Sequence, residues 1–245
     1  MKLQPKGVFC RGLADGIPIA LGYLSVSFGF GISAVSGGLS PLVAVLISLA
    51  NLTSAGQVAG LGIILAKGTF FEMAITQLVI NIRYFLMSLS LSQRLDGRFT
   101  LGHRLLAAFG ITDEIFGVAS SKKERLVPRY MYGLILLPVL GWTLGTLLGA
   151  VAGNILPDAL KHALGIAIYG MFVAIVVPPA REHSGVLLGV TVAIAISCLL
   201  AYLPLFSFIT SGFSIIIAAL IGAVVAAILF PIPEEHTDEE SEVAK

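Results

Sequence analysis

The sequence contains little charge. Asp, Glu, Lys and Arg make up only 12% of its 245 residues, whereas they make up roughly 25% of a soluble domain. Hydrophobic residues account for 57% of the chain, and the mean hydropathy is +0.97. The chain therefore has about half of the charge that covers a soluble globule. Its composition excludes that class and predicts an integral membrane protein.

Catalytic and metal-binding patterns are absent as well. Cys10 and Cys198 are the two cysteines, too few and too far apart for a disulfide framework or a zinc cluster. The sequence has no HExxH, GxSxG or phosphate-loop motif, and its basic residues form no patch interleaved with aromatic residues. We therefore expect no enzyme, metal site or cofactor, and no nucleic-acid partner.

Long apolar runs show where the chain meets the lipid bilayer. A membrane-spanning helix needs about 20 apolar residues, and residues 16–66 and 184–233 contain no Asp, Glu, Lys or Arg. The runs are continuous rather than alternating, which favours helices over a β-barrel. We predict an all-α polytopic bundle with apolar segments at residues 12–35, 41–66, 69–91, 127–153, 159–179, 185–205 and 212–231.

The distribution of basic residues predicts the topology, because Lys and Arg are retained on the cytoplasmic side. They precede the first segment and are concentrated again over residues 94–129. Three simple crossings would place these two regions on opposite sides. The conflict disappears if 41–66 is a broken, re-entrant helix that returns to its starting side. This gives six spans with both termini cytoplasmic. The alternative is seven spans, with 105–120 also crossing or lying in the interface.

The chain is expected to form a single membrane transport domain over residues 1–233. Six of the fourteen acidic residues follow Pro233, and the tail 234–245 is too polar to pack. We predict that this tail is disordered and cytoplasmic. Within the spans, glycines recur at helical spacing and are predicted to let helices approach closely. They are Gly22, Gly29, Gly31, Gly141, Gly145 and Gly149.

The centre of segment 41–66 is unusually polar and flexible. Transporters use helices broken at the bilayer midplane, because an N-terminal helix end attracts an anion and a C-terminal end attracts a cation. The alternative is that these residues hold neighbouring helices together. The candidate substrate ligands at this break are Asn51, Ser54, Gly56 and Gln57.

Arg83 lies about fourteen residues into segment 69–91. An arginine at mid-membrane costs about 2.5–3.5 kcal/mol on insertion scales, so it needs a polar partner. One interpretation is a guanidinium fork for a substrate carboxylate, with Asn81 and Tyr84 beside it. The alternatives are a structural ion pair with one of the acids at 113 and 114, or snorkelling of the side chain to the interface.

The short apolar stretch 105–120 is predicted to be a half-helix, because it is too short for a span and contains Asp113 and Glu114. A carboxylate at membrane depth could accept a substrate ammonium group or a coupling proton. Alternatively, Thr112 is a helix N-cap, and both acids favour the helix start.

Taken in order, several motifs resemble the AzlC family over about residues 8–230. They are Gly12-Leu-Ala-Asp-Gly-Ile-Pro-Ile-Ala-Leu-Gly22, Ser36-Gly-Gly-Leu-Ser40, Ser54-Ala-Gly-Gln57, Asn81-Ile-Arg-Tyr84 with Ser88-Leu-Ser-Leu91, and Thr112-Asp-Glu114. The sequence departs from the family pattern in the polar run Leu52-Thr-Ser54 and at Tyr84, where histidine is frequent.

The resemblance implies the large permease subunit of an exporter of branched-chain, hydrophobic amino acids in the cell (cytoplasmic or inner) membrane. It also implies a small four-helix membrane partner of the AzlD type. We then expect Arg83 and the break at 54–57 to bind the substrate carboxylate. Asp113 or Glu114 would receive the ammonium group or a coupling proton.

An apolar wall for the substrate side chain is expected from the first segment, with Tyr23 and Phe28. Two other functions remain open at this stage. One is a channel-like or structural membrane subunit that needs a partner, and the other is an exporter of another small organic solute or ion.

Overall fold

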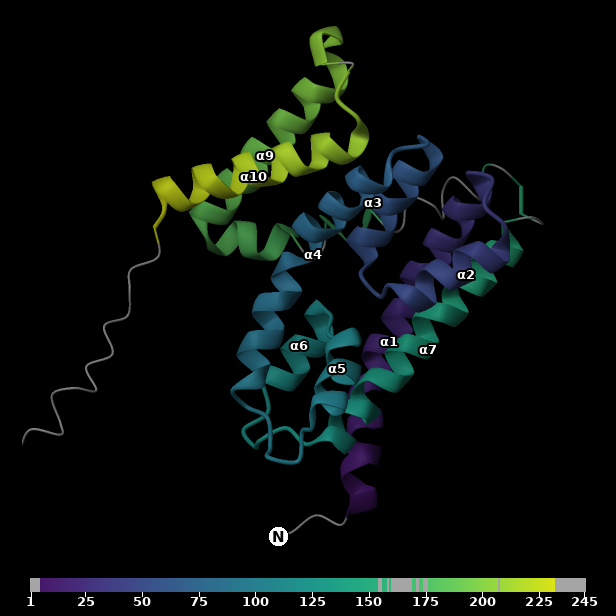
Figure 1. The fold of residues 1–245 in the computed structure, drawn as a ribbon, viewed down its shortest axis with the longest axis vertical. Coiled ribbons are helices and arrows are strands. Elements are labelled where there is room, and N and C mark those ends of the chain that lie inside the picture. Colours follow the sequence, from purple (N-terminus) through teal and green to yellow (C-terminus); the bar gives the residue numbers. More distant parts are fainter. Residues whose placement is uncertain are drawn as a thin grey trace, which may run out of the picture. The chain divides into compact units, whose positions relative to one another are not determined.

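The computed structural model describes residues 5–153, 156–157, 159, 169–170, 172–173, 176–206 and 208–231. Within this part of the chain every regular element is a helix, apart from a single bridge between Leu95 and Leu126 (Figure 1). The elements are α1 (Pro5–Ser36), α2 (Pro41–Ala50), α3 (Ser54–Leu65), α4 (Phe70–Ser92), α5 (Leu101–Phe109), α6 (Asp113–Ser120), α7 (Pro128–Ala152), α9 (Ser184–Tyr202), the 3-10 turn η1 (Pro204–Phe206) and α10 (Ser211–Leu229).

Five of the described helices are long and apolar enough to cross a membrane. They cover residues 7–36, 70–92, 128–152, 184–202 and 212–229. The predicted span 159–179 lies largely outside the described residues. The prediction of an all-α polytopic membrane protein is confirmed.

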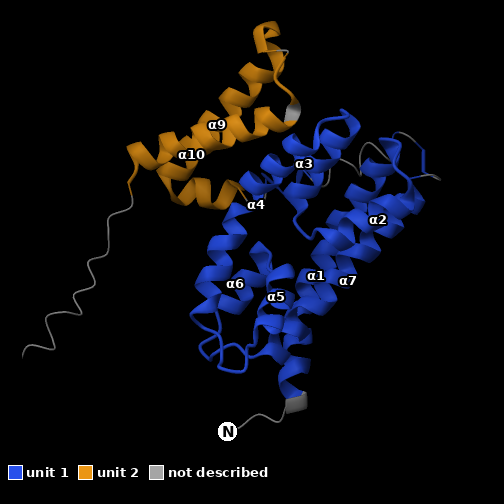
Figure 2. Cartoon of the chain, viewed as in Figure 1, with its two compact units in different colours: residues 1–173 blue, residues 174–245 orange. Residues whose placement is uncertain are grey.

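The chain divides into two compact units, residues 1–173 and 174–245 (Figure 2). In the second unit α9 and α10 pack through small residues, since a methyl group on Gly222 would lie 2.7 Å from the carbonyl oxygen of Gly189. The predicted single domain over 1–233 stays a prediction, and the predicted tail 234–245 lies outside the described residues. All of the predicted site residues belong to the first unit.

In the first unit, α1 and α7 lie side by side and run in the same direction (Figure 1). A methyl group on Gly12 would overlap the carbonyl oxygen of Tyr130, and one on Gly149 would overlap that of Phe28. The predicted role of glycine in close helix packing is thus confirmed at Gly149, and equally at Gly31, Gly141 and Gly145. The prediction is wrong for Gly22, where an added methyl group would meet nothing within 4 Å.

The predicted helix break in 41–66 is confirmed: α2 ends at Ala50 and α3 begins at Ser54. Asn51 causes this break. Its Oδ1 accepts from the backbone amide of Thr53 at 3.0 Å and from the Thr53 hydroxyl at 2.8 Å. These bonds offer the backbone an alternative to a continuing helix. At its far end α3 returns to the end of α1, where the side chain of Leu65 contacts Gly37. The segment is therefore re-entrant.

Residues 105–120 differ from the expected single half-helix. They belong to two helices, α5 and α6, because the chain breaks at Gly110 and Thr112 takes an extended conformation. The alternative prediction that Thr112 is an N-cap is confirmed, since its hydroxyl accepts from the amide of Ile115 at 3.4 Å. Arg94, just beyond α4, donates to the carbonyl of Ser120, so α6 returns to the end from which α5 began. The pair α5–α6 is a second re-entrant hairpin.

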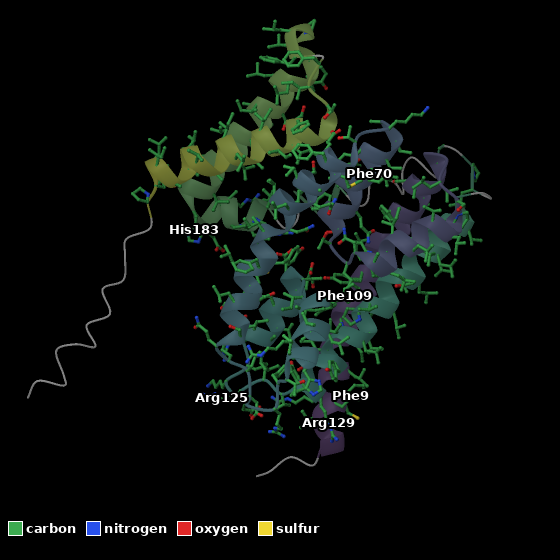
Figure 3. The ribbon with its side chains drawn as sticks, in the orientation of Figure 1. Phe9, Phe70, Phe109, Arg125, Arg129 and His183 are labelled. Atoms are coloured by element: carbon green, nitrogen blue, oxygen red, sulfur yellow. The ribbon has the colours of Figure 1, made fainter. Side chains whose placement is uncertain are left out.

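The two basic regions of the sequence meet at one end of this unit. Lys122 lies 2.7 Å from Asp15 of α1, and Arg11 lies 3.4 Å from Glu124. Figure 3 shows Phe9, Arg125 and Arg129 at this same end. The two basic regions therefore share a side, as the sequence predicted. Because α1 and α4 each cross once between them, segment 41–66 must return to the side on which it starts.

The connection between α4 and α5 is fixed to the connection between α6 and α7. The amide of Asp96 donates to Leu126 at 2.8 Å, and that of Leu126 donates to Arg94 at 2.9 Å. The Nε of Arg98 donates to Asp96 at 2.7 Å, and this hydrogen bond lowers the pKa of the Asp96 carboxyl below its ordinary value. These contacts hold together the open end of the α5–α6 hairpin, where α5 begins and α6 ends.

Candidate functional site between two helix breaks

Helix α4 carries polar side chains that reach both re-entrant hairpins. The side-chain amide nitrogen of Gln77 donates to the backbone carbonyl of Gly56, in the first turn of α3, at 2.8 Å. Less than two turns further on, the Nη2 of Arg83 lies 2.9 Å from the carboxylate of Asp113, the first residue of α6. Asn81 lies between them and donates to Gln77 at 3.0 Å. Polar side chains of α4 thus contact the N-terminal turns of both half-helices.

The α2–α3 break is held by side chains of the break itself and of α4. Asn51 donates to the side-chain oxygen of Gln77 at 3.4 Å. A methyl group on Gly56 would lie 2.7 Å from this same oxygen, so only glycine allows Gln77 to approach. The N-cap residue Thr53 is turned toward Asn51 and does not cap α3. The backbone amides in the first turn of α3, beginning with that of Ser54, therefore receive no side-chain cap from Thr53.

Gln57, predicted as a substrate ligand, is hydrogen-bonded within the first hairpin. The residue is only 1% exposed, and its side chain donates to the carbonyl of Asn51 and accepts from Ser48 at 3.2 Å. The hydroxyl of Ser48 in turn lies 2.7 Å from that of Thr146 on α7. Gln57 is thus hydrogen-bonded inside the hairpin and ties the break to α7, as the helix-holding alternative expected.

Arg83, Tyr84 and Asp113 form a three-residue polar cluster. Arg83 donates to the hydroxyl of Tyr84 at 3.1 Å, and this hydroxyl donates to Asp113 at 3.3 Å. The ion pair that the sequence offered as an alternative partner for Arg83 is therefore present. It is not sealed, because the side chains of Arg83 and Asp113 are 42% and 28% exposed.

Two atoms beside this cluster have no hydrogen-bond partner among the described residues. They are the Nε of Arg83, a donor, and the Oδ1 of Asn81, an acceptor. Buried polar atoms in proteins are nearly always paired, so each unpaired one needs an explanation. A ligand would need an acceptor to satisfy the Nε of Arg83 and a donor to satisfy the Oδ1 of Asn81.

Glu114 points to different partners from its neighbour Asp113. Its Oε2 accepts from the hydroxyl of Tyr23 on α1 at 2.5 Å, and this hydroxyl lies 2.6 Å from that of Thr112. Adjacent acids therefore have different surroundings: Asp113 faces a guanidinium, whereas Glu114 faces the neutral hydroxyl of Tyr23. The two carboxylates therefore differ in the charge of their partners: one partner is cationic and the other is neutral.

An apolar cluster adjoins these polar groups. Leu52 from the first break and Ile111 from the second belong to one buried cluster with Tyr23 and Trp142. The edge of one of these two aromatic rings meets the face of the other, at a centroid distance of 5.2 Å. Tyr23, expected as part of an apolar wall, thus contributes both a ring to this cluster and a hydroxyl to Glu114.

Sequence reasoning missed Gln77, Ser48, Thr146 and Trp142 as parts of this region. A signal existed for Gln77, which lies one helical turn before Asn81 in an otherwise apolar span. No pattern in the sequence indicated that hydroxyls at positions 48 and 146 meet, since they are 98 residues apart.

A family comparison accounts for the part of the chain that holds this site. The model of the AzlC protein family matches residues 18–156, more than half of the chain and all of the predicted site residues. The chain belongs to the AzlC family. No solved structure matches it.

Curated relatives of this AzlC-family protein are membrane proteins. It is 28% identical to the inner membrane protein YgaZ of Escherichia coli over 234 residues, which are 93% of this chain and 94% of that protein. It is 33% identical to an uncharacterized membrane protein of Archaeoglobus fulgidus over 178 residues, 72% of this chain and 78% of the other. A membrane protein of Helicobacter pylori is 27% identical over 60% of this chain and 66% of its own length. The family and these relatives support a transport-related membrane protein.

Proposed function

We propose that this AzlC-family protein is a secondary transporter that exports branched-chain amino acids across the cytoplasmic membrane. The observation that carries the proposal is the part-exposed Arg83–Asp113 pair, with an unpaired donor and an unpaired acceptor on α4 beside it. These groups lie near the N-terminus of α3, which Thr53 leaves without a side-chain cap, and the N-terminus of α6, and next to an apolar cluster. That combination suits a small molecule with one anionic, one cationic and one apolar part.

A zwitterion inserts into an ion pair without changing the net charge of the site. The substrate carboxylate would bind Arg83, including its free Nε, with help from Tyr84 and the amides at the start of α3. The ammonium group would bind Asp113 and the free Oδ1 of Asn81. A singly charged solute would leave one of the two charges unpaired, which is costly at membrane depth.

The substrate side chain would lie against the apolar cluster. Leu52, at the tip of the first hairpin, and Trp142 of α7 supply apolar surface within this cluster. Burial of each methylene there contributes about 0.8 kcal/mol, which favours leucine, isoleucine and valine over glycine or alanine.

Glu114 is the proposed carrier of the coupling proton. Asp113 has a cation as its partner, and protonating it would break that pair. Glu114 faces the hydroxyl of Tyr23, which can act as either donor or acceptor, so a proton can be added or removed without leaving a guanidinium unpaired.

The basic end of the first unit is proposed to face the cytoplasm, which would place the N-terminus there, and the C-terminus too if the predicted span at 159–179 crosses. The direction of transport and the small four-helix AzlD-type partner rest on the family resemblance alone. Alternating access would arise from movement of the hairpins about the site at the midplane.

The test is counterflow of labelled leucine into proteoliposomes, with and without the small partner. We expect saturable uptake that excess leucine inhibits and excess glutamate or lysine does not. Non-saturable flux would favour a channel, and uptake that leucine does not inhibit would favour another solute. Uptake that requires the partner would make the complex the transporting unit.

Arg83→Ala should abolish this uptake, whereas Arg104→Ala, on the exposed face of α5, should leave it unchanged. Because Arg83→Ala leaves Asp113 without its cation, the Arg83→Ala/Asp113→Ala double variant is also needed. Normal leucine uptake by the double variant would overturn the proposed site.

A further inference from the structure

A cavity lies at the basic end of the first unit, apart from the candidate substrate site. It has a volume of about 120 Å³, room for roughly four water molecules. The N-terminal part of α1, the start of α7 and the connection before α7 line it. It belongs to neither re-entrant hairpin tip, and the transport proposal makes no use of it.

The cavity is lined by three cations and one acid. The cations are Arg11, Lys122 and Arg125, and the acid is Glu124. Lys122 is held in place by Asp15 at 2.7 Å, and its ammonium lies 5.6 Å from the ring centre of Tyr130. In the part of the chain that the structure describes, Arg125 takes part in no ion pair. The lining therefore has a surplus of positive charge.

The acid does not prevent an anion from binding. The carboxylate of Glu124 is 3.4 Å from Arg11, a loose contact, and its side chain is 73% exposed. An exposed pair of this kind contributes little free energy, so Glu124 can turn to water and release the guanidinium. Arg11 and Arg125 would then present two forks of N–H donors to the cavity.

The position of the cavity matches the depth of lipid head groups. The candidate membrane-spanning helix in α1 starts at residue 7, and that in α7 starts at residue 128. Val8 and Val127 line the cavity beside the cations, so its wall is partly apolar. A basic pocket with an apolar side between helix ends suits a phosphate group that continues into a lipid.

We propose that this cavity binds a phosphate ester or phosphate anion, with Arg11, Lys122 and Arg125 as its ligands. The same chemistry is offered by the head group of an anionic phospholipid and by free phosphate. Binding would join α1, the 121–127 connection and α7 at the end where the two helices begin. Basic residues are also common in cytoplasmic loops in general. If that preference alone explained these cations, removing Arg125 or Lys123 would weaken anion binding equally. The proposed cavity predicts that only the loss of Arg125 matters.

The experiment is native mass spectrometry of the full chain in a neutral detergent, with phosphatidylglycerol, phosphatidylcholine or inorganic phosphate added. Arg125→Gln is compared with Lys123→Gln, which removes the same charge from an exposed side chain that does not line the cavity. Glu124→Gln removes the competing acid. Gel filtration and circular dichroism check that each variant is folded.

We expect one phosphatidylglycerol to be retained by the native chain and by Lys123→Gln. Arg125→Gln should weaken retention about fivefold, in line with the loss of one basic contact to an anionic lipid. Glu124→Gln should strengthen retention, because Arg11 is then free. If millimolar phosphate displaces the lipid, free phosphate is a ligand too; if it does not, the site belongs to the lipid.

Equal effects of Arg125→Gln and Lys123→Gln would overturn the proposal in favour of diffuse surface charge. Equal retention of phosphatidylcholine and phosphatidylglycerol would overturn it as well, as would weaker retention after Glu124→Gln. None of these results bears on leucine uptake, so this proposal and the transport proposal can fail separately.

Discussion

The guanidinium of Arg83 lies 2.9 Å from the carboxylate of Asp113, and this contact joins a membrane-spanning helix to the N-terminus of a half-helix. The hydroxyl of Tyr84 bridges the same two groups. An intramembrane arginine thus has its required partner, yet both side chains remain partly exposed. The pair fixes the inner end of the α5–α6 hairpin and, in the proposed mechanism, is the place where a zwitterion enters.

Removing one partner of this pair should cost more stability than removing both. Arg83→Ala should lower the free energy of unfolding by about 1–2 kcal/mol, between the values typical of exposed and buried pairs, because Asp113 is left without a cation. The Arg83→Ala/Asp113→Ala double variant should recover most of that loss. Thermal unfolding in detergent measures both. A double variant less stable than either single variant would show that the two residues stabilise the fold through other contacts.

Glu114→Gln should remove the dependence of leucine export on a pH gradient while leaving leucine exchange measurable, because the amide cannot carry the coupling proton. Tyr23→Phe should slow gradient-driven export without abolishing it, because Glu114 loses the hydroxyl of Tyr23 as a partner. Tyr132→Phe, whose hydroxyl bonds His103 instead, is the matched control. Gradient-driven export by Glu114→Gln at the native rate would exclude Glu114 as the proton carrier.

Gly149→Ala should destabilise the packing of α1 on α7. The added methyl group overlaps the backbone of Phe28, which cannot move aside as a flexible side chain can. Overpacking of this kind costs about 1–3 kcal/mol. Gly22→Ala is the control, because the space around it is open and alanine favours a helix by up to about 1 kcal/mol. Similar melting temperatures for the two variants would contradict the close approach of α1 and α7.

Thr146→Val should loosen the α2–α3 break, because Ser48 then loses its hydroxyl partner on α7. A cost of about 1 kcal/mol is expected from the lost hydrogen bond. Thr143→Val is a matched control on the same helix, since that hydroxyl donates only to the carbonyl of Val139 one turn earlier. Hydrogen exchange at residues 51–57 should rise in Thr146→Val alone; equal protection in both variants would mean that α7 does not hold the break.

Much of the re-entrant segment 41–66 could be predicted from the sequence. A polar centre in an apolar run, together with basic residues that had to share a side, required the chain to turn back, and Asn51 indeed ends α2. The second hairpin was predicted only in part. Gly110 and Thr112 are helix-ending and helix-starting residues, but apolar residues on both sides masked the break between α5 and α6.

The sequence by itself determined the membrane class, the apolar helices, the first break and the polar residues at membrane depth. These features depend on composition, on hydrophobic length and on local hydrogen bonding, which neighbouring residues decide. The tertiary structure decided which acid pairs with Arg83, which one meets Tyr23, and that Gln57 forms a hydrogen bond with Ser48. Such choices depend on how helices distant in sequence are rotated and placed against each other, and adjacent acids on one helix turn necessarily point in different directions.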